Sequence, residues 1–219
     1  MEKLTKEDIQ FIDTYLKNSD IIFTDIRIEM VDHIASEIEN VINNGDSRDF
    51  YYLFKDYMIA NKRKLLNDRK KYFKASDKKI FRILLKKFFS FQGMIIFCLT
   101  LFSFNLINEF TDNNKSMFHF VKYTPFVLLI IIGMIYFLFI KKKEERYSSV
   151  ERITFYFVVI GQLINILANP SFIKIELVTS LDLTWLKIGA SIFVLVLILL
   201  LKISFELKNE YVLKYKKVL

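Results

Sequence analysis

Glu29, His33 and Glu37 recur every four residues, so on a helix they lie along one line with Asp32 beside them. A carboxylate and an imidazole at this spacing could share a metal ion. The three groups are spread too far along the helix for one coordination sphere, and no second His or Cys is near them in the sequence. Our first interpretation is that His33 pairs with a neighbouring carboxylate at the helix surface or at a contact between helices, and Glu29, Asp32, His33 and Glu37 are the candidate contacts for a protein partner. A pH-sensitive contact stays open, because neighbouring carboxylates favour a charged imidazole.

Gln162, Asn165 and Asn169 form a second group, placed on one helical face within an apolar run. Side-chain amides in such a run hydrogen-bond between membrane helices, and this is our first interpretation. A polar pore or a ligand site is the alternative. Proton and ion pathways usually need ionisable groups inside the membrane, and the middle of each apolar run has none.

Motifs of the common enzyme classes are absent. The sequence has no phosphate-binding glycine loop, nucleophile elbow, HExxH helix or paired-cysteine metal motif. The one cysteine, Cys98, has no partner for an intramolecular disulfide. We predict a non-enzymatic protein with no cofactor and no metal, and a membrane enzyme of an unfamiliar kind stays a third possibility.

Four apolar runs dominate the chain after residue 87, and each is predicted to be a membrane-spanning helix. They cover residues 88–108, 121–140, 153–173 and 185–205. About 20 residues of helix cover the roughly 30 Å of a bilayer interior. The third run is interrupted by Pro170, so it either spans the membrane or is re-entrant.

Charge is sorted along the sequence. The first sixty residues hold 6 basic and 13 acidic side chains, whereas residues 61–87 hold 12 basic and 2 acidic ones. Connections between the apolar runs then alternate between poor and rich in Lys and Arg. This pattern predicts an inner-membrane protein with both termini in the cytoplasm, and it accounts for the net charge of +8 without nucleic acid.

The basic stretch before the first apolar run has two interpretations. It could simply anchor the chain by the positive-inside rule, or it could bind anionic lipid head groups. The candidate lipid contacts are Lys70, Lys71, Lys74, Lys78, Lys79, Arg82, Lys86 and Lys87.

The elements that must position these groups are helices. Apolar residues recur every three or four positions, and we expect helices over about residues 5–18, 24–44, 48–71 and 77–87. Thr5, Thr24 and Ser76 are the expected N-caps of the first, second and fourth, and either Asp46 or Ser47 that of the third. The fourth helix is expected to continue into the first span. The predicted fold is all-α, with a small cytoplasmic helical domain (1–75), a basic juxtamembrane helix (76–87), a four-helix transmembrane bundle and a cytoplasmic tail (206–219).

Part of the second helix carries a resemblance to a known family. The segment Asp25–Ala35 contains the pattern E-x-V-D-H-I-A and is followed by Ile38-Glu39 and Gly45. Over about residues 5–65 it resembles HAAS-type (DUF1700-like) signalling domains, which precede membrane spans in bacterial proteins. The resemblance implies a cytoplasmic sensing or interaction module.

Together these patterns favour an integral membrane protein with a cytoplasmic regulatory or protein-interaction domain that senses or signals. Its expected partners are anionic lipids and either a cytoplasmic protein or further copies of the chain. The alternative is a small transporter or channel component that acts as an oligomer through the face of Gln162, Asn165 and Asn169.

Overall fold

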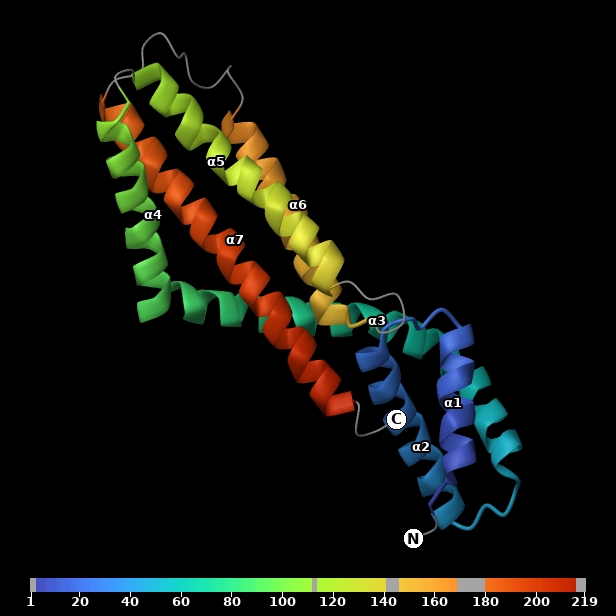
Figure 1. Cartoon of the computed structure of the whole chain (residues 1–219). Coiled ribbons are helices and arrows are strands. Elements are labelled where there is room, and N and C mark those ends of the chain that lie inside the picture. Colours follow the sequence, from blue (N-terminus) through green and yellow to red (C-terminus); the bar gives the residue numbers. More distant parts are fainter. Residues whose placement is uncertain (1–2, 112–113, 141–145, 169–179, 216–219) are drawn as a thin grey trace. The chain divides into compact units, whose positions relative to one another are not determined.

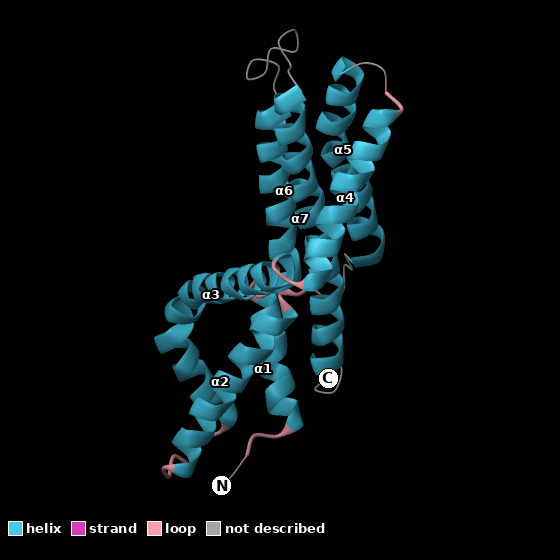
Figure 2. Cartoon of the chain, turned by 90° about the vertical axis from the view of Figure 1, so that its left-hand side faces the viewer, coloured by secondary structure: helices cyan, strands magenta, loops and turns pink. Residues whose placement is uncertain are grey.

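The computed structural model describes residues 3–111, 114–140, 146–168 and 180–215. Regular structure in these residues is helical throughout, which confirms the all-α prediction (Figures 1 and 2). The chain forms two compact units. One comprises Met1–Asp77, Lys142–Ser149 and Tyr211–Leu219, and the other comprises Lys78–Lys141 and Val150–Glu210.

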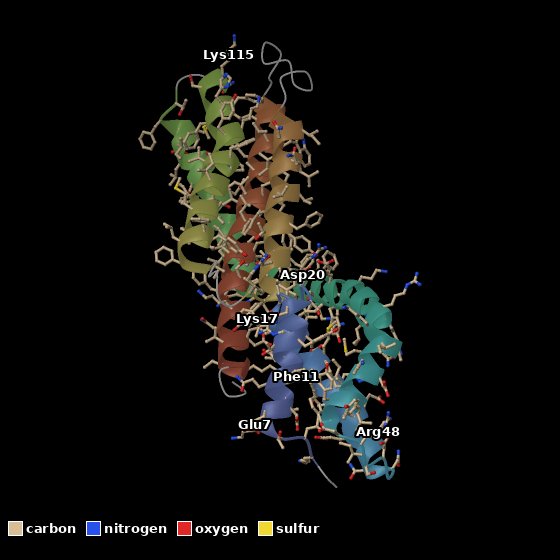
Figure 3. All side chains as sticks on the ribbon, turned by 90° about the vertical axis from the view of Figure 1, so that its right-hand side faces the viewer. Glu7, Phe11, Lys17, Asp20, Arg48 and Lys115 are labelled. Carbon is tan, nitrogen blue, oxygen red and sulfur yellow. The ribbon has the colours of Figure 1, made fainter. Side chains whose placement is uncertain are left out.

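Helices α1 (Lys6–Asn18), α2 (Thr24–Asn43) and the first part of α3 (Phe50–Phe88) form the N-terminal unit. Each turns one apolar stripe towards a shared core, as their three-to-four-residue periodicity requires. Phe11 of α1, labelled in Figure 3, packs edge-on against Phe50 and Phe54 of α3. The core includes the buried residues Ile12, Leu16, Ile26, Met30, Ile34, Ile38, Leu53, Phe54 and Met58.

Local sequence sets most of the helix ends in this unit. Thr5 and Asp8 form the expected capping box at the start of α1. Gly45 follows α2 with a φ of +98°, a conformation that costs glycine little, and its N–H donates to the Ile42 carbonyl at 3.0 Å. The cap of α3 is Asp49, whose carboxylate accepts from the Tyr51 N–H at 3.1 Å, so the prediction of Asp46 or Ser47 was wrong.

The predicted break between residues 71 and 77 is also wrong, because α3 is one continuous helix from Phe50 to Phe88. No Gly or Pro interrupts this stretch, and an uncapped helix continues where nothing stops it. Ser76 does not cap a new helix. It is buried, and its hydroxyl bonds to serines from a distant part of the chain.

The chain turns sharply between α3 and α4 (Phe91–Glu109), so the expected continuous helix into the first span is wrong (Figures 1 and 2). Ser90 is the N-cap of α4: its hydroxyl accepts from the Gly93 N–H at 3.2 Å and donates to the Lys87 carbonyl at 2.6 Å. Gly93 lies against the end of α3. A Cβ there would lie 2.5 Å from the carbonyl oxygens of Lys87 and Phe88, so the turn requires glycine.

In the part of the chain that the structure describes, four helices are long and apolar enough to cross a membrane, as predicted. They are α4, α5 (Asn114–Ile135) with the π-helical segment η1 (Tyr136–Ile140), α6 (Ser148–Ala168) and α7 (Ser180–Tyr215), and most of each belongs to the second unit. The axes of α5, α6 and α7 are roughly parallel in both views (Figures 1 and 2). Helix α6 begins before the predicted residue 153, and the predicted end at 173 lies outside the described residues. Helix α7 continues well beyond the predicted residue 205.

One line of residues on α7 fixes the turn between α3 and α4. Lys202 donates to the Gln92 side-chain oxygen of α4 at 2.8 Å. One and two turns later, Glu206 and Glu210 pair with Lys87 at 2.9 Å and Lys79 at 2.8 Å, both on the last part of α3. The spacing of four residues places all three groups on one face of α7.

Candidate functional site

The starts of α2 and α6 cap each other within the N-terminal unit. The residue before α2 is Phe23, which has no side-chain acceptor, and the Thr24 N–H instead donates to the Arg146 carbonyl at 2.8 Å. In return, the Asp25 carboxylate accepts from the N–H of Ser148, the first residue of α6, at 2.9 Å. Thr24 is therefore not the cap that its sequence position predicted. The first N–H groups of a helix need acceptors, and here each segment supplies the other's.

A buried hydroxyl network extends from this pair of caps. We call Asp25, Ser76, Ser148, Ser149 and Tyr211 the hydroxyl network. Asp25 accepts a second bond, from the Ser148 hydroxyl, at 2.6 Å. Ser76 lies 3.2 Å from Ser148 and 3.0 Å from Ser149, oxygen to oxygen, and Ser149 lies 2.9 Å from the Tyr211 hydroxyl. The network joins α2 and α3 to the start of α6 and to the end of α7.

The groups of the hydroxyl network are buried, so the loss of one of their hydrogen bonds is costly. Asp25 is 7% exposed, and Ser148 and Ser149 are 2% and 1% exposed. A buried carboxylate that loses its donors leaves an unsatisfied charge, which costs more than an exposed one would. Asp25 also places negative charge at the positive end of the α6 dipole. Arg146 and Tyr147 reinforce the contact, since Arg146 lies over the Phe23 ring and Tyr147 stacks on Tyr211 at 5.2 Å.

Sequence reasoning missed the hydroxyl network. Asp25 and Ser148 are separated by 123 positions, and nothing near either residue points to the other. The Ser148-Ser149 pair directly before an apolar run is a typical helix start, and it was the only local sign available.

The outer side of α2 carries the four residues that we predicted to contact a partner. Glu29, Asp32, His33 and Glu37 are all exposed, on the side opposite the core residues Met30 and Ile34 of the same helix. Within the described part of the chain, no three His, Cys, Asp or Glu residues are close enough to hold a metal ion. Nearby, burial and the charge of Glu37 raise the pKa of the Tyr57 phenol.

The predicted intramembrane face lies at a groove between α5 and α6. Gln162 and Asn165 line this groove of about 900 Å³, together with Gly133, Tyr136, Glu151, Thr154, Gly161 and several apolar residues. Both amides are exposed and make no side-chain hydrogen bond with a described residue. Asn169, the third member of the predicted face, lies outside the described residues.

The eight basic residues predicted to contact lipid divide into groups. Lys79 and Lys87 are paired with glutamates of α7. Lys71, Lys74, Lys78, Arg82 and Lys86 are exposed. The side chain of Lys70 lies outside the described residues.

Two further lysines are buried among the spans. Lys187 of α7 is 7% exposed and donates to the Asn105 side chain of α4 at 3.1 Å. Lys122 of α5 is 8% exposed and lies over the rings of Phe118 and Tyr123. These contacts join α4 to α7 and pack the start of α5, so we assign the two lysines to the packing of the bundle.

No protein-family model, curated protein or solved structure matches the chain. The resemblance to HAAS-type domains therefore stays a prediction.

Proposed function

We propose that this multi-pass membrane protein is a regulator. Its N-terminal helical unit binds a cytoplasmic protein, and this binding alters the membrane-spanning helices. Binding takes place at the acidic outer face of α2 (Glu29, Asp32, His33 and Glu37). Transmission uses the start of the same helix, where Asp25 and the hydroxyl network hold the first residues of α6.

One observation carries this proposal: a single helix has an exposed charged face and also holds the start of a membrane helix. A partner that shifts α2 would change the bonds from Asp25 to Ser148. Because α6 continues from Ser148 into its apolar span, the same shift would reach the spans. Coupling of this kind requires an element with two arrangements that the partner stabilises unequally.

The proposed location is the inner membrane, with both termini in the cytoplasm. Support comes from the connections between the four apolar helices, which alternate between rich and poor in Lys and Arg. Reporter fusions after Asn113 and Leu219 test this orientation. We expect a periplasmic signal at Asn113 and a cytoplasmic one at Leu219, and the opposite pair of signals would reverse the proposal.

Photo-crosslinking in cells tests the binding face. A photoreactive residue replaces Ser36, which is exposed among the acidic residues of α2, and in a control chain it replaces Gln10, which is exposed on α1. We expect one discrete protein adduct at Ser36 and none at Gln10. The adduct should disappear with Glu29→Gln/Glu37→Gln.

The matched charge control is Glu7→Gln/Asp20→Asn, which removes two exposed acids elsewhere in the same unit and should leave the adduct intact. Equal crosslinking at both positions, or an adduct that survives the α2 variant, would contradict the binding proposal. With the partner identified, Asp25→Ala tests transmission. Binding should remain, whereas the partner should no longer alter hydrogen exchange over residues 148–152.

A second candidate function is transport, and the groove between α5 and α6 favours it. Gln162 and Asn165 place two amides in an otherwise largely apolar lining, as a site for an amphiphilic solute would. Solute flux in proteoliposomes that is lost on Asn165→Leu would support this candidate over the regulator.

A further inference from the structure

The last three turns of α3 present two stripes on their exposed side. Lys78, Arg82 and Lys86 are spaced by four residues and are all exposed. Phe81 and Leu85, spaced by four as well, are 54% and 42% exposed beside them. Residues four apart on a helix lie on one face, so the exposed side has a basic stripe next to an apolar one.

The opposite side of the same turns is occupied. Ile80 is fully buried, and Lys79 and Lys87 pair with Glu210 and Glu206 of α7. The basic residues of this segment are therefore sorted by face, with the paired ones inward and the exposed ones outward. No acidic residue occurs between Lys78 and Phe88, so the exposed face has only positive charge.

The turn at Ser90 and Gly93 sets the direction of this segment. Helix α4 leaves the end of α3 at a sharp angle, and the two views agree (Figures 1 and 2). If α4 crosses the membrane, the end of α3 then runs along the membrane surface and not into it. Phe89 and Phe91, at the turn itself, are both 78% exposed and extend the apolar stripe to the start of the span.

We propose that Lys78–Phe88 is an in-plane membrane helix that binds anionic lipid head groups. Phe81 and Leu85 enter the boundary between head groups and acyl chains, while Lys78, Arg82 and Lys86 contact lipid phosphates. A helix with one apolar and one basic face binds at this depth. Basic side chains next to a membrane surface are attracted by anionic lipids, and the attraction is screened by salt. This inference is independent of the proposed regulatory function.

Lipid retention by the full-length protein provides the first test. The chain is purified in mild detergent, incubated with phosphatidylglycerol or phosphatidylcholine, and the bound lipid is counted by native mass spectrometry. We expect Lys78→Gln/Arg82→Gln/Lys86→Gln to weaken phosphatidylglycerol binding by roughly tenfold to a hundredfold at low salt. Phosphatidylcholine binding should not change.

The matched control is Lys6→Gln/Lys17→Gln/Lys55→Gln, which removes the same charge from exposed positions of the N-terminal unit. It should bind phosphatidylglycerol as the unaltered chain does. Equal losses in the two variants would mean that net charge, and not this face, attracts the lipid. Displacement of the lipid by millimolar inorganic phosphate would identify a free-phosphate site and would overturn the proposal as well.

Depth measurement provides a second test that does not depend on the charge variants. Cys98, the single cysteine, is replaced by Ser, and a cysteine at Leu85 or at the control position Glu7 carries a fluorophore. In nanodiscs with brominated acyl chains, we expect strong quenching at position 85 and little at position 7. Equal quenching at both positions would show that the segment does not lie in the membrane surface.

Discussion

Replacement of Gly93 by alanine tests whether the turn between α3 and α4 is built as described. The new Cβ would lie 2.5 Å from two backbone carbonyl oxygens, where carbon and oxygen normally approach to about 3.3 Å. Two backbone groups would have to move by several tenths of an ångström, and overpacking of this kind costs about 1–3 kcal/mol. Alanine gains about 0.5–1 kcal/mol over glycine within a helix. The cost of the clash is therefore expected to exceed this gain, with a net loss of up to about 2.5 kcal/mol.

Thermal unfolding of the full-length protein in mild detergent measures this loss. At about 2–4 °C per kcal/mol for a chain of this size, Gly93→Ala should lower Tm by up to roughly 10 °C. Gly189→Ala on α7 is the control, because its Cβ would have no heavy atom within 4 Å, and its Tm should stay the same or rise. An equal rise for both variants would refute the close approach of Gly93 to the end of α3.

Three other changes give distinct results. In denaturant unfolding, Asp25→Ala should destabilise the N-terminal unit by about 2–4 kcal/mol, because the Ser148 N–H and hydroxyl lose their buried acceptor. Asp25→Asn should cost less, because the side-chain amide keeps one acceptor oxygen. Gly45→Ala should cost about 1 kcal/mol by the same measurement, because alanine is strained at a φ of +98°. Burial raises the pKa of Tyr57 above its ordinary 10.0. The protonated phenol therefore stabilises the folded state fully below about pH 10, and this contribution is lost as the pH rises through the folded pKa. Tyr57→Phe should therefore reduce the loss of stability above pH 10, and an unchanged alkaline profile would contradict the burial of that phenol.

Local patterns predicted the helices and the four spans, because apolar periodicity and uninterrupted apolar runs depend only on nearby residues. The caps show where this reasoning fails. Thr5 found its partner three residues away, as predicted, whereas the acceptor for Thr24 came from Arg146 and the partners of Ser76 from Ser148 and Ser149. Long-range partners leave no periodic trace in the sequence.

The candidate sites show the same division. Exposure of Glu29, Asp32, His33 and Glu37 agrees with their position opposite the apolar stripe of α2, and that stripe is visible in the sequence. The division of the basic stretch into paired and exposed residues is different, because it depends on how α7 lies against α3. Only the contacts with Glu206 and Glu210 separate Lys79 and Lys87 from their neighbours.

Assembly of the N-terminal unit from separated parts of the chain has a consequence for synthesis on the ribosome. Helices α1 and α2 emerge first, but the acceptor for the Thr24 N–H and the donors for Asp25 arrive with Arg146 and Ser148, after two spans have been made. Tyr211 arrives only after the fourth. At a synthesis rate of about 5–20 residues per second, the Asp25 carboxylate lacks its Ser148 donors for many seconds. Its final packing thus follows membrane insertion, so a chain whose spans fail to insert would keep an incomplete N-terminal unit that proteases can recognise.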